Sequence, residues 1–146
     1  MLLLQETIIL PLLNQNFTSS TESYNVAVGY AAGLSVTTGV NNTLIGGLTG
    51  DAITTGNSNA ALGYGALGSN TTASDNTATG VNALTANTTG GSNVAVGTYS
   101  LTANTTAANN TAVGYGSLRA NTTGTQNTAV GESALATTTT GGYNTA

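Results

Sequence analysis

The stretch NTAVGYGSLRANTTGTQ at residues 110–126 runs directly into NTAVGESALATTTTGGY at residues 127–143, and the two align without a gap. The same spacing of 17 residues extends back to residue 25 and is simplest to follow in one glycine per unit. Such register does not arise from composition alone, so residues 25–143 form seven repeats and residues 144–146 begin an eighth. This glycine row comprises Gly29, Gly46, Gly63, Gly80, Gly97, Gly114 and Gly131.

A period of 17 residues is too short for a helical hairpin repeat, which needs about 30 residues or more. It suits one coil of a β-solenoid, made of two or three short strands joined by tight turns. Thr, Asn and Gly make up nearly half of the chain, whereas the helix formers Glu, Lys, Gln and Arg are scarce. The repeat therefore predicts an all-β, parallel β-solenoid (β-roll) of seven coils, coil 1 at residues 25–41 and coil 7 at residues 127–143. With coils about 4.8 Å apart, the rod would be roughly 34 Å long.

Disorder is the competing interpretation of a chain so rich in Gly, Asn and Thr. The apolar residues of the repeats nevertheless keep strict register, which a disordered linker has no reason to maintain.

Charged residues are few: Arg119 stands against five acidic residues, for a net charge of −4. One cation cannot displace the counterions of a nucleic acid, so we expect no nucleic-acid partner. The chain contains no Cys and no His. Structural zinc, haem and iron–sulfur sites are therefore not expected, disulfides are impossible, and we expect neither a metal nor a cofactor.

Catalysis is not expected either. Ser and Thr are plentiful, but no His or Lys is present to activate them. Residues of neighbouring coils meet when they occupy the same place in the repeat, and no two carboxylates do so. No paired acid and base, and no calcium ladder, is therefore predicted.

One asparagine opens every repeat. We interpret this asparagine row as a stacked amide ladder that hydrogen-bonds from coil to coil; a row of amides that recognises a ligand is the alternative. Its members are Asn25, Asn42, Asn59, Asn76, Asn93, Asn110, Asn127 and Asn144.

The segment Asn-Thr-Ala-Val-Gly is the expected strand, and both of its faces are largely apolar because adjacent strand residues point to opposite sides. We assign the larger residues to the core, together with a leucine four residues after the glycine: Val28, Ile45, Leu62, Val96, Val113, Val130, Leu67, Leu84, Leu101, Leu118 and Leu135. The small face is predicted to contact another copy of the chain, as are two tyrosines that share one place in the repeat: Ala61, Ala78, Ala95, Ala112, Ala129, Tyr24 and Tyr143. Coils 1 and 2 carry Gly33 and Gly50 in place of the leucine, and Val36 and Ile53 where later coils have asparagine, so we expect them to pack differently.

Each repeat also contains a pair of threonines, from Thr37-Thr38 to Thr139-Thr140, of which at most one can point outward. Outward hydroxyl ladders of this kind are used by ice-binding proteins. Glycosylation sequons begin at seven asparagines, which in a chain of this composition can also be coincidental. They are Asn16, Asn41, Asn70, Asn87, Asn104, Asn109 and Asn121.

The two ends differ from the repeats. Residues 1–24 begin with an apolar stretch broken by Glu6 and Pro11, which is too short for a membrane span and lacks the basic start of a signal peptide. We expect these residues to form a capping or docking segment and a linker, with the repeat domain at residues 25–146. The sequence stops three residues into a repeat, which predicts either head-to-tail stacking of copies or a piece of a longer fibre.

The repeats Asn110-Thr-Ala-Val-Gly-Tyr-Gly-Ser-Leu118 and Asn127-Thr-Ala-Val-Gly-Glu-Ser-Ala-Leu135 resemble the head repeats of bacterial trimeric autotransporter adhesins and the related repeats of phage tail fibres. The resemblance covers residues 25–146. It implies a parallel β-roll that trimerises, on a cell surface or a virion.

These observations lead to three functional hypotheses. The first is a non-enzymatic structural subunit of an extracellular fibre or filament, which has itself as partner, in a homo-oligomer such as a trimer, in a head-to-tail filament, or in both. The second is an adhesin head or tail-fibre shaft that binds a surface glycan or receptor. The third is an ice-binding solenoid.

Overall fold

The computed structural model describes residues 23–146. The predicted N-terminal capping segment therefore lies outside the described residues, except for its last two positions.

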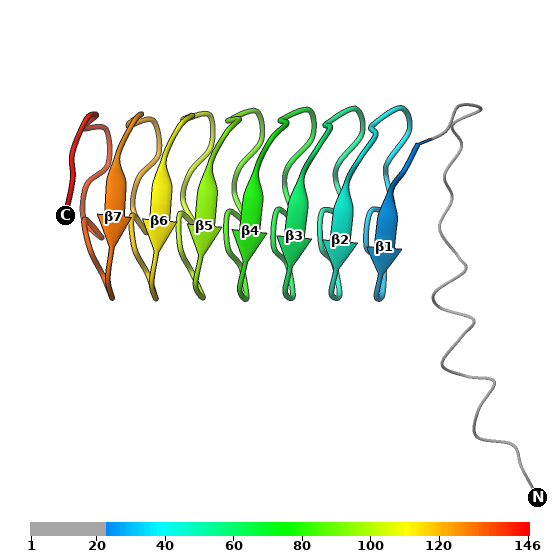
Figure 1. Ribbon diagram of the computed structural model, residues 1–146, viewed down its shortest axis with the longest axis horizontal. Helices are drawn as coiled ribbons and strands as arrows, with labels where there is room; N and C mark the ends of the chain where they lie inside the picture. The colour runs from blue at the N-terminus through cyan, green and yellow to red at the C-terminus, as the bar shows by residue number, and fades with distance from the viewer. Residues whose placement is uncertain (1–22) are drawn as a thin grey trace, which may run out of the picture.

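The described chain winds into a rod with seven three-residue strands side by side along its length (Figure 1). The strands form one sheet in the order β1 to β7 and are parallel throughout. Each pairs with the next in a register of one repeat, as Ala27 with Leu44 and Ala112 with Ala129. The predicted parallel β-solenoid is confirmed. The strands are β1 (Val26–Val28), β2 (Thr43–Ile45), β3 (Ala60–Leu62), β4 (Thr77–Thr79), β5 (Val94–Val96), β6 (Thr111–Val113) and β7 (Thr128–Val130).

Each coil contains a single strand, where the sequence suggested two or three. Left-handed backbone at several places in every coil bends the chain out of extended conformation: in coil 4 these are Asn82, Leu84 and Ser92, at φ 55°, 52° and 57°. The bent segments still hydrogen-bond to the next coil, since the Leu84 N–H donates to the Ser100 carbonyl at 3.0 Å. Main-chain ladders therefore run along all sides of the rod, although only one side is a regular sheet.

The glycine row turns the chain sharply after each strand. Its φ values lie between 129° and 136°, a region that L side chains rarely adopt. Coils also approach very closely here: a Cβ built on Gly63 would lie 2.6 Å from the carbonyl oxygen of Gly80. Glycine is thus required both by the positive φ and by the close approach of neighbouring coils. The φ is nearly constant along the row, whereas the closeness of the approach varies.

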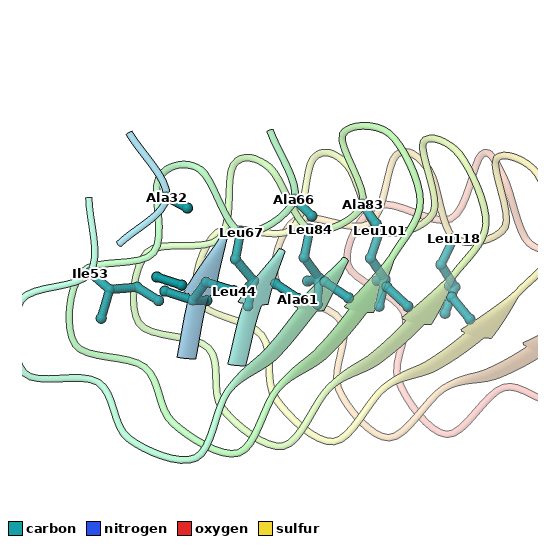
Figure 2. Close-up of a cluster of buried hydrophobic side chains, with 14 of the residues drawn as sticks. Ala32, Leu44, Ile53, Ala61, Ala66, Leu67, Ala83, Leu84, Leu101 and Leu118 are labelled. Atoms are coloured by element: carbon teal, nitrogen blue, oxygen red, sulfur yellow. The ribbon is translucent and has the colours of Figure 1, made fainter. Parts of the chain in front are cut away.

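The interior is lined by the alanine of each strand and by the leucine on the opposite wall. Figure 2 shows Leu67, Leu84, Leu101 and Leu118 following one another along the core. All four are fully buried, and Leu135 is partly buried against the same cluster. The leucines four residues after the glycine row are therefore placed correctly in the predicted core.

The predicted faces of the strand are reversed. The alanines assigned to a subunit interface are buried at 0–3% exposure: Ala61, Ala78, Ala95, Ala112 and Ala129. The larger residues assigned to the core point outward, with Ile45 37% and Val130 61% exposed. Together with Thr79, which has the same place in coil 4, they form what we call the valine row: Val28, Ile45, Leu62, Thr79, Val96, Val113 and Val130. The physical reason is the thinness of a coil. A leucine from the opposite wall crosses the interior, which leaves the strand room for little more than a methyl group.

Coils 1 and 2 fill the same interior by a different distribution of volume. In coil 2, Leu44 replaces the alanine, Gly50 replaces the leucine, and Ile53 stands where later coils have a buried asparagine; Leu44 and Ile53 are both fully buried. A Cβ on Gly50 would lie 2.9 Å from Leu44 Cδ2 and 2.8 Å from Ile53 Cδ1, so these side chains occupy the leucine's space. The different packing predicted for these coils is present.

Candidate functional site

The asparagine row forms a continuous ladder inside the rod. The Asn93 N–H donates to Asn76 Oδ1 at 3.0 Å, and Asn93 Nδ2 donates to the Ala107 carbonyl at 2.9 Å. In turn Asn93 Oδ1 accepts the Asn110 N–H at 3.0 Å. The N–H to Oδ1 bond links each of the eight asparagines to the next. The members of the row from Asn42 to Asn127 are buried. The row is therefore the amide ladder that joins the coils, and these amides do not face solvent, where a ligand would bind.

A second ladder, which the sequence interpretation missed, runs beside the first. Nδ2 of Asn87, Asn104 and Asn121 donates to Oδ1 of the equivalent asparagine one coil earlier, at 3.3, 2.9 and 3.2 Å. The same Nδ2 atoms donate to a carbonyl three residues on, where the two ladders meet: the Ala107 carbonyl accepts from both Asn93 and Asn104. We call Asn70, Asn87, Asn104 and Asn121 the second asparagine row.

This row overlaps four of the seven glycosylation sequons. All four asparagines are fully buried and their Nδ2 atoms are hydrogen-bonded, so the folded coil has no room for a glycan on them. Asn41 and Asn109 lie on the surface, and Asn16 lies outside the described residues. One signal in the sequence marks the second row as interior, because Val36 and Ile53 occupy its place in coils 1 and 2.

The second ladder is incomplete at its last member, since Asn121 Oδ1 is buried without a hydrogen-bond partner. Coil 7 has Thr138 in the row's next place. We expect Thr138→Asn to supply the missing Nδ2 donor and to raise the free energy of unfolding by about 1 kcal/mol. Equilibrium unfolding in guanidinium measures this. Thr137→Asn, at the exposed neighbouring position, is the control; equal effects of the two variants would contradict the assignment.

The two hydroxyls of a threonine pair differ in their hydrogen bonding. The first hydroxyl of a pair bonds to the next coil, as Thr88 Oγ1 does to the Thr105 carbonyl at 3.0 Å. The second threonine is exposed in every coil. This outer threonine row comprises Thr38, Thr55, Thr72, Thr89, Thr106, Thr123 and Thr140.

The outward face of the sheet is uncharged, and its side chains are aliphatic or threonine. It combines the valine row with the residues that begin each strand, which are Val26, Thr43, Ala60, Thr77, Val94, Thr111 and Thr128. We call these two rows together the outer sheet face. Tyr24 and Tyr143, the tyrosines predicted at an interface, are 70% and 79% exposed, at the two ends of the described rod.

Acidic groups are dispersed. Within residues 23–146 no three His, Cys, Asp or Glu side chains gather in a way that could hold a metal ion. Burial raises the pKa of Asp51 above its ordinary 3.8, against the opposing effect of hydrogen bonds from the backbone of Asp51 and Ala52. The folded state thus binds this proton more tightly than the unfolded chain. The contribution of Asp51 to stability is accordingly largest below pH 3.8 and is lost as the pH rises through the folded-state pKa.

The fold and the two buried ladders define the class of the protein: a β-solenoid repeat protein with seven parallel strands. No helix in residues 23–146 is long and apolar enough to cross a membrane. Comparison with protein-family models, with curated proteins and with solved structures finds no match.

Proposed function

We propose that the protein is a structural subunit of an extracellular fibre or filament, and that its role is mechanical. The observation that carries this proposal is the continuity of hydrogen bonding along the axis. Each coil offers the next its main-chain groups, its asparagine row and the first hydroxyl of its threonine pair. Bending the rod would stretch many of these bonds together, so ladders of this kind favour a stiff shaft.

Lateral association with a second copy is proposed to use the outer sheet face. Its aliphatic side chains recur in six of the seven coils, at about 4.8 Å, and coil 4 has Thr77 and Thr79 in their place. The same face on a parallel copy has the same spacing, so contacts made at one coil repeat at every other. No residue of the face is charged, which removes repulsion between copies. The resemblance to trimeric adhesin and tail-fibre repeats agrees with such packing, now assigned to the valine row in place of the alanines.

Axial growth would use the ladders themselves. Asn144 already joins the asparagine row as earlier members do: its N–H and its Nδ2 donate to Asn127 Oδ1 at 3.0 and 2.8 Å. A following coil, from the same polypeptide or from another copy, would extend the same bonds. Electron microscopy of purified protein tests this growth, since only short discrete rods at high concentration would argue against it.

Two single variants, each with one glutamate in coil 5, test lateral association. Val96→Glu puts a charge on the outer sheet face, whereas Thr106→Glu puts one on the outer threonine row. We expect the wild type and Thr106→Glu to sediment as oligomers, and Val96→Glu to sediment as a monomer with unchanged circular dichroism. A monomeric wild type, or equal sedimentation of the two variants, would contradict the assigned interface.

Ice binding is the second candidate, and the outer threonine row favours it because its seven side chains are exposed in register. The row lies on a bend of the coil. It forms only one column of free hydroxyls, because the first threonine of each pair donates its hydroxyl to the next coil. Thermal hysteresis that disappears in Thr89→Val and Thr106→Val would support this candidate over the mechanical role.

A further inference from the structure

Two surface residues, Tyr99 of coil 5 and Arg119 of coil 6, depart from the repeat, and Tyr99 contacts both Arg119 and Tyr115. Tyr99 lies where other coils have Ala, Leu, Gly, Asn or Ser, and Arg119 lies where others have Leu, Asp, Gly, Thr or Ala. Tyr115 shares its place with two other tyrosines, Tyr30 and Tyr64. Since the remaining coils form the same solenoid with other residues at the positions of Tyr99 and Arg119, the fold does not require these two side chains.

The three side chains form a compact cluster. The rings of Tyr99 and Tyr115 meet edge to face, with centroids 6.0 Å apart and planes at 86°. The guanidinium carbon of Arg119 lies 6.0 Å from the centroid of Tyr99, within the range of a cation–π contact. Tyr115 remains 51% exposed and Arg119 is exposed. The cluster is therefore both ordered by its own contacts and open to solvent.

The backbone at the centre of this cluster has the left-handed conformation that its place has in every coil, as in Ala31, Asn82 and Ser133 at φ 55–56°. Tyr99 has φ 59°, in the left-handed region. For a bulky aromatic residue this costs about 1–2 kcal/mol, whereas Gly65 and Gly116 occupy the same place at low cost. The conformation is therefore shared along the rod, and what distinguishes coil 5 is the bulky ring that Tyr99 places there.

Electrostatics indicate the charge of a ligand. Arg119 is the chain's single cation among five acidic residues, and it forms no ion pair within residues 23–146. The guanidinium lies beside the Tyr99 ring, and its N–H groups lie in the guanidinium plane. That planar fork matches a carboxylate with two parallel hydrogen bonds.

We propose that Tyr99, Tyr115 and Arg119 form a binding site for a carboxylate-bearing saccharide. Arg119 pairs with the carboxylate, and Tyr115 offers its half-exposed ring to the apolar face of the pyranose. The phenolic hydroxyls bond to sugar hydroxyls, because Tyr presents an apolar body with a polar tip. The site goes beyond the proposed mechanical role and does not depend on self-association.

A saccharide fits this surface better than an acidic peptide does. Around the cluster the equivalent places of coils 4 to 7 include Asn82, Thr98, Thr102 and Ser133, which supply neutral hydroxyl and amide groups for a polyol, and one acidic residue, Glu132, at the place of Tyr115 in coil 7. The exposed ring of Tyr115, with hydroxyl groups around it, suits the amphipathic ring of a sugar, which needs no deep apolar pocket.

The test is an NMR titration of ¹⁵N-labelled protein with three saccharides. Tetragalacturonate and 3′-sialyllactose carry a carboxylate on a hexuronate or on a sialic acid, and lactose is the neutral control. We expect shifts of amide signals around residues 98–102 and 115–119 with at least one acidic saccharide at up to about 10 mM, and none with lactose. The acidic saccharide that binds identifies the source of the carboxylate.

Three variants give the result its residue assignment. Arg119→Gln and Tyr115→Ala are expected to weaken binding roughly tenfold or more. Tyr64→Ala removes a half-exposed tyrosine of the same row that lacks an arginine beside it, and should leave affinity unchanged. No binding of either acidic saccharide, equal binding of lactose, or undiminished binding by Arg119→Gln would overturn the proposal. Sedimentation of the same samples reports self-association separately, so this site and the fibre role fail independently.

Discussion

Leu44→Ala is expected to lower the free energy of unfolding by about 3–5 kcal/mol. Leu44 is fully buried, and its Cδ atoms fill the space that a leucine fills from the opposite wall in later coils. Gly33 and Gly50 lie next to those atoms and cannot expand into the vacated volume. The cavity therefore persists, which places the cost in the upper part of the range for such truncations. Guanidinium unfolding followed by circular dichroism measures it.

The companion variant adds a side chain on the opposite wall of the same coil. Gly50→Leu alone should destabilise by about 1–3 kcal/mol, because its Cβ would lie 2.8–2.9 Å from Ile53 and Leu44. Backbone strain is not the obstacle: Gly50 has φ 55°, and Leu67 occupies the same place in coil 3 at φ 54°.

The triple variant Leu44→Ala, Gly50→Leu, Ile53→Asn reproduces the interior of coil 3. We expect it to recover most of the stability that the single variants lose. Additive losses would show that the two walls do not share one interior, and would contradict the assigned packing.

The second large effect concerns the glycine row. Gly63→Ala is expected to prevent coils 3 and 4 from stacking, since the new Cβ would lie 2.6 Å from the Gly80 carbonyl oxygen, which belongs to the backbone and cannot rotate away. Gly131→Ala is the matched control, because Gly131 has φ 134° against 136° for Gly63 but has nothing within 4 Å of its Cβ position. It should lose only the conformational cost of about 1–3 kcal/mol.

The comparison of the two variants separates close approach from strain. We expect Gly63→Ala to lose cooperative unfolding or to unfold in two transitions, one on each side of the disrupted junction. Gly131→Ala should keep one transition at lower guanidinium concentration. Equal loss in both variants would mean that φ alone explains the glycine row.

The repeat length predicted the fold correctly, because the repeat length is set by the backbone geometry of one coil. A glycine every 17 residues and an asparagine four residues before it are needed at the same point of each coil, so their spacing directly reports the length of one turn. The asparagine ladder followed from the same register, since residues at equal places stack. The number of strands per coil did not follow, because left-handed positions at Leu84 or Asn82 carry no distinctive residue type.

The direction of the side chains was harder to predict. Alternation along β5 (Val94–Val96) requires two faces but does not say which faces inward, and the larger residues were assigned inside by size. The structure gives the reason for the observed direction, because in coil 2 Leu44 and Ile53 fill the space that a leucine fills in later coils. The same reasoning places the second asparagine row inside, since it alternates with Val36 and Ile53.

The amino-acid sequence by itself determined the parallel solenoid, its repeat length and its main amide ladder, because all three are consequences of periodicity. Only the tertiary structure decided which face of the strand is the core, that the second asparagine row is interior, and that Tyr99, Tyr115 and Arg119 meet on the surface. The physical reason is that period fixes which residues stack along the axis. The cross-section of a coil depends on how side chains from opposite walls divide one small volume, and that division is a property of their three-dimensional packing.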